Sequence, residues 1–390
     1  MAQTINHTFN SLLNRIISNP NAEAPKIHNA LRIGILCDES FDPEHIIIPA
    51  RTKSDLKITA IATPDPALTQ RLGKTHSIPR TYDTYAHLIR SLHIDAVYIA
   101  LPFPQRHAII LQCIRKEMPV LCEGPISVSG EEAQEIYSRA AEKQLEEGGK
   151  GVLILEDLWV LAHPATHRAR ELVQKAGTPV RATIKWTATD GIDATSMTHQ
   201  CLSLLRFLIG SEVADVTTSE VRRNAADGTL ADAVTAELRF INGCIATLEV
   251  DTRVAPTSPV GFLGGLGLGK KEDAPTIEID CEHQKVTYYN FTTPNIFNTL
   301  SLTPLPPITD HVYSGTPWPS YPTESAWTPH RFVLEGFCLG VKGRSSGASP
   351  WWVRREFSES GVDVLGLVFG RGGMVLGGGM GGAEATFSIE

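Results

Sequence analysis

The sequence predicts an α/β protein with a Rossmann-like, doubly wound parallel sheet, followed by a second α+β domain whose sheet is mostly antiparallel. Between residues 31 and 150, short apolar runs alternate with segments of helical periodicity, as in parallel sheets covered by helices. From residue 151, runs with period-2 alternation follow one another with few helices between them. That second pattern is typical of an antiparallel sheet.

The first domain is expected to hold four buried strands, because four short apolar runs are each bounded by polar or turn-forming residues. A further helix starts at Ser129, where Ser-Gly-Glu-Glu has the spacing of a capping box, and runs towards Gly148. The predicted strands are 31–36, 56–61, 96–100 and 120–122, and the predicted helices between them are 66–72, 85–91 and 107–116.

The second domain is expected to begin with a buried strand and a helix before its alternating strands. A later helix carries an apolar stripe formed by Met197, Cys201, Leu204, Leu205 and Leu208. The predicted strands are 152–155, 180–186, 235–240, 245–251, 276–281 and 285–291, and the predicted helices are 164–176 and 195–208.

These patterns divide the 390 residues into four parts. Residues 1–30 are expected to form an N-terminal docking arm, with a weak mitochondrial presequence as the alternative. The Rossmann-like domain spans 31–150, and a substrate and dimerisation domain spans 151–345. Repeated glycines after residue 359 make helix or strand costly, so 346–390 is expected to be a flexible, Gly-rich tail.

The composition excludes several classes of partner. A net charge of −8 gives no reason to expect nucleic-acid binding or attraction to an anionic membrane surface. The seven cysteines are scattered and show no Cys-x-x-Cys spacing, so neither a disulfide framework nor a metal site is predicted. No apolar run approaches the roughly 18 residues of a membrane span. We expect a cytoplasmic protein with a small-molecule substrate.

Several motifs occur together between about residues 30 and 345. They include Asp95-Ala-Val-Tyr-Ile-Ala-Leu-Pro102, Val120-Leu-Cys-Glu-Gly-Pro125, His163-Pro164, Leu205-Arg206 and Tyr289-Asn-Phe291. On these motifs the chain resembles the Gfo/Idh/MocA oxidoreductase family, and within it the dihydrodiol-dehydrogenase-like branch. The resemblance implies NAD(P)-dependent hydride transfer and a homodimer formed through the open face of the second sheet.

Two departures from the family pattern concern the first domain. Where the family carries Glu-Lys-Pro, this chain has Glu123-Gly124-Pro125, so the lysine is absent. A pyrophosphate needs glycines after the first strand, so that backbone amides can approach it at a helix N-terminus. Here the turn at 37–44 contains no glycine and four acids. Both departures predict that the dinucleotide site is degenerate.

Two further departures concern the second domain. The resemblance places an Asp and a His of the family four residues apart on a helix, and these positions fall on Ser196 and Gln200. A slip of one residue would place Thr195 and His199 there instead, so the aspartate is absent in either register. The Tyr-Arg pair that often precedes the His-Pro element is replaced by 160–161, Val-Leu.

Three residues are predicted to do acid–base chemistry. Glu123, freed from a lysine partner, could have a raised pKa, or could only fix the loop after its strand. The resemblance places His163 at the domain cleft, and His199 lies on a polar stripe of a cleft-lining helix, where a histidine suits a general base near pH 7. The predicted substrate pocket adds His107, Trp159, Trp186, Ser196 and Gln200.

Two candidate nucleotide contacts are weaker. Asp65, after the second strand, could accept a hydrogen bond from a ribose hydroxyl if NAD binds, with ordinary solvation as the alternative. Residues 264–271 match Gly-x-x-x-x-Gly-Lys, but Lys271 stands where a P-loop needs Ser or Thr, which favours a hairpin loop.

The sequence leaves three functions open. In the first, the cleft has become a cofactor-independent lyase, isomerase or cyclase site for a small metabolite, and no cofactor is expected. In the second, the chain is an NAD- or NADP-dependent oxidoreductase for an alcohol, sugar or dihydrodiol, with His199 as a replacement proton donor. In the third, it is a non-catalytic sensor or assembly subunit.

Overall fold

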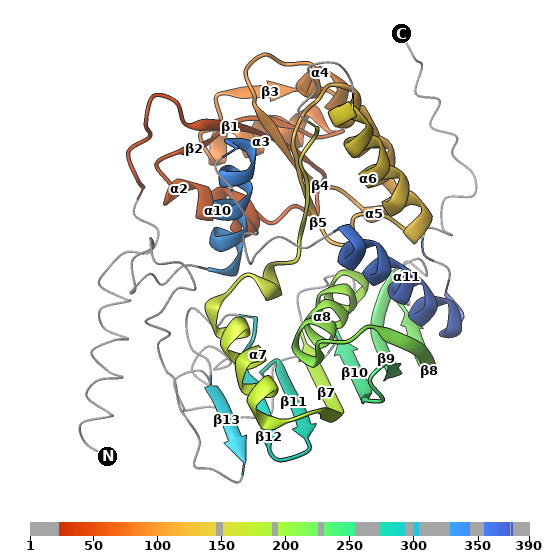
Figure 1. The fold of residues 1–390 in the computed structure, drawn as a ribbon. Helices are drawn as coiled ribbons and strands as arrows, with labels where there is room; N and C mark the ends of the chain where they lie inside the picture. Colours follow the sequence, from red (N-terminus) through yellow and green to blue (C-terminus); the bar gives the residue numbers. More distant parts are fainter. Residues whose placement is uncertain are drawn as a thin grey trace, which may run out of the picture.

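The computed structural model describes residues 23–145, 151–188, 194–224, 230–253, 274–292, 299–303, 328–343, 355–374 and 376. A six-stranded sheet with the order β3-β2-β1-β4-β5-β6 forms the upper half of the molecule in Figure 1. A seven-stranded sheet with the order β13-β12-β11-β7-β10-β9-β8 forms the lower half. The predicted fold class is therefore confirmed.

Every pairing of the six-stranded sheet is parallel. One face is covered by α2 and α10, and the other by α4, α5 and α6. The strands are β1 (Leu31–Cys37), β2 (Leu56–Ala62), β3 (Arg80–Tyr82), β4 (Ala96–Ala100), β5 (Val120–Glu123) and β6 (Ile154–Asp157), and the helices are α2 (Pro43–Arg51), α3 (Pro66–Thr75), α4 (Tyr85–Ile89), α5 (Phe103–Arg115), α6 (Gly130–Leu145) and α10 (Pro329–Val341).

The predicted capping box opens α6. The Ser129 hydroxyl accepts a hydrogen bond from the Glu132 amide at 3.3 Å, and the Glu132 carboxylate accepts one from the Val128 amide at 3.2 Å. Both bonds satisfy amides that the helix leaves without internal partners.

The seven-stranded sheet is antiparallel apart from the parallel pair β7–β10. Helices α7, α8 and α11 supply buried side chains to the core on one of its faces. The strands are β7 (Pro179–Thr187), β8 (Val213–Arg223), β9 (Ala231–Phe240), β10 (Ile245–Asp251), β11 (Thr276–Cys281), β12 (Lys285–Tyr289) and β13 (Thr299–Thr303), and the helices are η1 (Trp159–Leu161), α7 (Pro164–Ala176), α8 (Ala194–Ile209) and α11 (Arg355–Arg371).

Two segments assigned from the sequence to the second domain lie with the parallel sheet. Strand β6 pairs with β5, and the apolar face of α10, including Phe332 and Phe337, is buried in the core beside β1 and β4. The chain therefore leaves the first half after β6 and returns to it with α10, which brings the start of α10 to the boundary between the halves (Figure 1).

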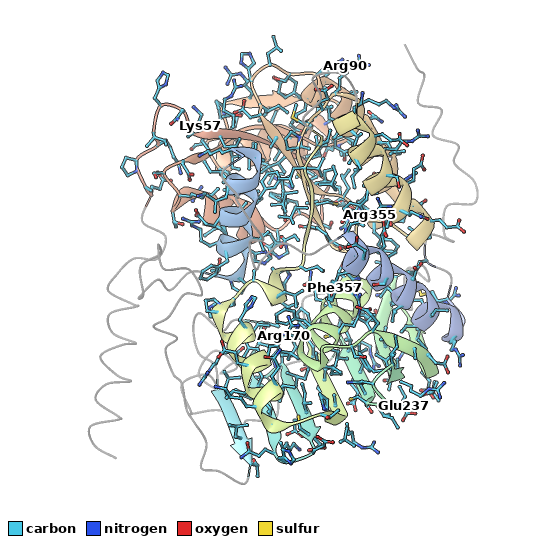
Figure 2. The ribbon with its side chains drawn as sticks, viewed as in Figure 1. Lys57, Arg90, Arg170, Glu237, Arg355 and Phe357 are labelled. Carbon is cyan, nitrogen blue, oxygen red and sulfur yellow. The ribbon has the colours of Figure 1, made fainter. Side chains whose placement is uncertain are left out.

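The prediction of a flexible tail is wrong for residues 355–371, which form α11. Val362, Leu365, Val368 and Phe369 recur at helical spacing and are buried. Their burial outweighs the cost of the intervening glycines, which amounts to about 1 kcal/mol each relative to alanine. In Figure 2, Arg355 and Phe357 mark the start of this helix at the boundary between the two halves.

Three predicted features lie outside the described residues: most of the N-terminal arm, the loop at 264–271 and the end of the tail after residue 376. Within the described part of the chain, none of the helices combines the length and the apolarity that crossing a membrane requires.

Candidate functional site

The carboxyl ends of two neighbouring parallel strands bring acidic side chains to the boundary between the halves. Glu123 ends β5 and Asp157 ends β6, and the two residues are register partners. Two helix starts face them, with His45 in the first turn of α2 and His330 in the first turn of α10. Ligands of doubly wound sheets bind at this edge. These four side chains are therefore the centre of the candidate site.

Glu123 is held by three neighbours. Its Oε1 lies 3.1 Å from His45 Nδ1 and accepts a hydrogen bond from the Tyr98 hydroxyl at 2.9 Å, while Oε2 lies 3.6 Å from Arg106 Nη2. Burial alone would raise the pKa of this carboxyl, but the hydrogen bond and charge of His45, together with Arg106, hold it below its usual value. Of the two alternatives that the sequence left open for Glu123, the raised pKa is not supported, because His45 takes the place of the missing cation.

His45 and His330 form a stacked pair, with ring centroids 4.4 Å apart and planes 22° from parallel. Burial opposes a charge on His45, yet its hydrogen bond to Glu123 and the charges of Glu123, Asp157 and Asp42 raise its pKa to about 9. His330 Nδ1 lies 3.3 Å from Asp157 Oδ2, but burial and the charge on His45 lower the pKa of His330. At neutral pH one ring is therefore an imidazolium and its neighbour a neutral imidazole.

Aromatic rings continue from this pair into the second half. The Trp159 ring lies 5.1 Å from that of His330 and meets Trp186 edge to face at 5.8 Å. Trp186 in turn meets Phe291 at 5.9 Å. Trp159 and Trp186, both predicted from the sequence as pocket residues, thus lie together beside the acid–base cluster, and both are half-buried.

His199 lies behind the cluster and is fully buried. Its Nε2 is 2.9 Å from Glu156 Oε1, and Glu156 also accepts hydrogen bonds from the Ile126 amide and the Ser358 hydroxyl. Burial would raise the pKa of Glu156, but His199 and these donors lower it. The imidazole also lies against the backbone of Gly124, where the family carries lysine.

Helix α8 carries two further predicted pocket residues, Ser196 and Gln200. Ser196 lies in the first turn of the helix and is half-buried. The amide nitrogen of Gln200 donates to the backbone oxygen of Asp157 at 2.9 Å, so Gln200 borders the site.

Three predicted residues are engaged elsewhere. His163 caps α7, where its Nδ1 accepts from the Ala165 amide at 3.1 Å. His107 Nε2 lies 3.0 Å from Glu135 Oε2 of α6. Asp65 caps α3 by accepting from the Ala67 amide at 2.8 Å. His163 and Asp65 therefore cap helices, and His107 joins α5 to α6.

The turn between β1 and α2 does not fit a pyrophosphate. Asp38 Oδ1 accepts hydrogen bonds from the Ser40 amide at 2.9 Å and its hydroxyl at 2.6 Å, so a carboxylate of the chain already occupies the two donors of Ser40. Arg106, a neighbouring cation, is committed to the backbone oxygens of Leu101, Glu123 and Pro125. A second anion would be repelled here.

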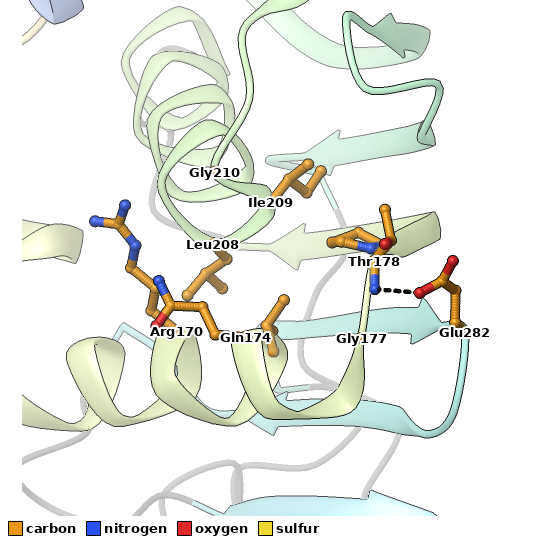
Figure 3. Close-up of a pocket in the computed structure, with 10 residues that line it drawn as sticks. Arg170, Gln174, Gly177, Thr178, Leu208, Ile209, Gly210 and Glu282 are labelled. Carbon is orange, nitrogen blue, oxygen red and sulfur yellow. Dashed lines mark hydrogen bonds between the residues drawn. The ribbon is translucent and has the colours of Figure 1, made fainter.

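Two hollows lie away from the cluster. One, of about 380 Å³, separates the ends of α7 and α8 beside Glu282, which accepts from the Thr178 amide (Figure 3). The other, of about 610 Å³, lies over strands β7 to β10 of the second sheet. Among the residues with described positions, no cluster of three or more His, Cys, Asp and Glu side chains is arranged to hold a metal ion.

Sequence reasoning missed His45 and His330. His330 follows Thr328-Pro329, a cap followed by proline at the first helical position, which is a sequence signal for a helix start. His45 directly follows the glycine-free turn at 37–44. Neither signal shows that the two rings stack.

Comparisons with known proteins agree with this architecture. Residues 32–146 match the family model described as "Oxidoreductase family, NAD-binding Rossmann fold". Trans-1,2-dihydrobenzene-1,2-diol dehydrogenase of Bos taurus is 23% identical over 279 residues, which cover 66% of this chain and 79% of that protein. D-xylose 1-dehydrogenase (NADP(+)) 2 of Haloferax volcanii is 29% identical over 150 residues, which cover 38% and 44%.

Solved structures show the same fold. A 3-ketoreductase from Actinomadura kijaniata, in complex with TDP-benzene and NADP, superposes with a TM-score of 0.67 at 15% identity, covering 87% of this chain and 97% of that one. These relatives do not support the expectation that no cofactor binds, and NAD or NADP remains a possible ligand. By the family model, residues 32–146 belong to the Gfo/Idh/MocA oxidoreductase family, and the chain as a whole is similar in sequence and fold to members of that family, including the dihydrodiol dehydrogenases.

Proposed function

We propose that the chain catalyses proton transfer on a small metabolite at this cluster, as a lyase, isomerase or cyclase that uses no nicotinamide. The observation that carries the proposal is the stacked pair of His45 and His330, whose pKa values are shifted in opposite directions. Neighbouring titratable groups with separated pKa values are suited to act as acid and base in one reaction. The carboxylate in the β1–α2 turn supports the same proposal.

His330 is the proposed base. Its Nδ1 faces Asp157, so the tautomer with a proton on Nδ1 leaves the Nε2 lone pair to accept a proton from a carbon acid. His45 is the proposed acid, because its Nδ1 is held by Glu123 while its Nε2 lies 3.8 Å from Asp42, too far for a hydrogen bond. The N–H at Nε2 can therefore protonate the departing or accepting atom.

The proton count balances in this scheme. His330 gains one proton and His45 loses one, so that the substrate loses a proton at one atom and gains one at another. The stacked rings, or water, then exchange the proton back. Glu123 and Asp157 act as positioning residues that set the two protonation states.

A second candidate function is NAD(P)-dependent oxidation or reduction. The names of the relatives favour it, since they are dehydrogenases and a ketoreductase, one of which was solved with NADP. His199 was the proton donor proposed for this reaction from sequence. Its complete burial beside Glu156 favours a structural role over that one.

A cofactor titration separates the two functions. Purified protein is titrated with NADH and NADPH while the reduced nicotinamide fluorescence is followed. The proposal expects no saturable change up to millimolar cofactor. A micromolar dissociation constant for either cofactor would reject it and support the oxidoreductase, whereas neither cofactor binding nor proton exchange with solvent for any carbon acid tested would favour a binding protein.

A further inference from the structure

We propose that Asp157 and Gln200 form a subsite that binds a protonated amine of the substrate. Both residues are almost fully buried, with 2% and 4% of their surface exposed. Within the described part of the chain, Asp157 Oδ1 and Gln200 Oε1 are buried acceptors without a hydrogen-bond donor. Buried polar atoms nearly always have a hydrogen-bond partner. Two such acceptors on contacting residues therefore require a ligand or a water as donor.

The orientation of the Gln200 amide follows from its other contact. Its nitrogen donates to the Asp157 backbone oxygen at 2.9 Å, and the reversed amide would set two carbonyl oxygens against each other. The remaining amide atom, Oε1, is therefore the one without a donor. Two contacting residues thus each carry a buried oxygen that can only accept a hydrogen bond, one from a carboxyl group and one from an amide.

The charges around Asp157 favour a cation as the ligand. Asp42, Glu123 and Asp157 all act on His45, whose single positive charge is already hydrogen-bonded to Glu123. Arg106 also faces Glu123. Among the described residues, the side-chain partner of Asp157 is His330. The His330 ring is neutral at pH 7, because the pKa of His330 is lowered. A buried carboxylate beside a neutral ring is strongly stabilised by a cation.

An ammonium group fits these features better than a hydroxyl. It offers three donors and a charge, whereas a hydroxyl offers one donor and no charge. The Trp159 ring beside His330 adds an aromatic face, to which a cation is attracted. The inference rests on the proposed function, because an amine held at Asp157 would place its neighbouring carbon beside the His330 base.

Calorimetric titrations at pH 7 test the subsite without turnover. The probes are benzylammonium chloride, benzyl alcohol as the neutral counterpart of similar size, and potassium chloride. We expect benzylammonium to bind at least tenfold more tightly than benzyl alcohol. Asp157→Asn and Gln200→Leu should each weaken benzylammonium binding, the former at least tenfold, and exposed Asp280→Asn should leave it unchanged. Circular dichroism confirms that each variant is folded.

Each other outcome overturns the inference. Equal binding of benzyl alcohol would indicate a hydroxyl subsite, and binding of potassium alone would indicate an inorganic cation site. Binding that survives Asp157→Asn lies elsewhere, and no binding of any probe would mean that water alone satisfies the two oxygens. A parallel NADPH titration reports on the proposed function, so a failure of that function is distinguished from a failure of the subsite.

Discussion

Replacing Gly124 with alanine tests whether the space of the family lysine is closed in this chain. A Cβ atom at position 124 would lie 3.0 Å from His199 Cδ2, 3.2 Å from Glu156 Oε1 and 3.3 Å from Leu158 Cδ2. All three distances are shorter than ordinary van der Waals contact. His199 and Glu156 cannot move aside at low cost, because they are buried and hydrogen-bonded to each other at 2.9 Å.

The expected magnitude follows from two opposing effects. Overpacking a buried site costs about 1–3 kcal/mol. Replacing glycine by alanine restricts the unfolded chain and returns about 0.4–1 kcal/mol. Gly124→Ala should therefore lower the free energy of unfolding by about 1–2 kcal/mol. The matched control is Gly366→Ala in the middle of α11, where a Cβ meets no atom within 4 Å. This change should raise the stability by about 0.5–1 kcal/mol.

Urea denaturation of both variants, repeated in a His199→Ala background, measures these effects. Removing the imidazole clears the closest contact, so Gly124→Ala should cost about 1 kcal/mol less in that background. If the two substitutions are additive to within about 0.5 kcal/mol, His199 does not fill the lysine space. A Gly124→Ala protein as stable as the wild type would refute the packing argument altogether.

Three further predictions follow from the same contacts. Because the pKa of His45 in the folded protein is raised to about 9, the contribution of His45 to folding stability is complete below its ordinary pKa near 6.5 and is lost as the pH rises through 9. The melting temperature should therefore fall between pH 7 and 10 more steeply in the wild type than in His45→Asn. Imidazole NMR titrations should give midpoints above 6.5 for His45 and below 6.5 for His330, and two midpoints at 6.5 would remove the basis of the proposed function. Leu365→Ala in α11 should cost about 2–5 kcal/mol by urea denaturation, whereas a loss under 0.5 kcal/mol would show that α11 does not pack.

The sequence predicted regular elements well where one periodicity dominates. Strands 96–100 and 245–251 and helix 164–176 have the bounds of β4, β10 and α7. It failed at α11, because local helix propensity counts each glycine as a penalty while burial against β8 and α8 exists only in the folded chain. Local pattern and tertiary packing disagree there, and packing decides.

The candidate site was predicted in part for a similar reason. Glu123, Trp159, Trp186 and Gln200 lie in motifs or on predicted elements, and all of them border the cluster. The histidines that define its chemistry are joined to their carboxylates across 78 and 173 positions of the chain. Contacts at such separations leave no local trace in a single sequence, so neither the stack of the rings nor their opposite pKa shifts could be predicted.

The geometry also links two departures that appear independent in the sequence. Without a lysine at position 124, Glu123 needs another cation, and the nearest comes from His45 in the first turn of α2. That turn is also where a dinucleotide would place its pyrophosphate in a fold of this kind. The ion pair that stabilises Glu123 therefore comes from the same helix start that would face a pyrophosphate in such a fold. A ligand that broke the bond between His45 and Glu123 would lower the pKa of His45 from about 9, because that bond and the Glu123 charge are the main causes that raise it.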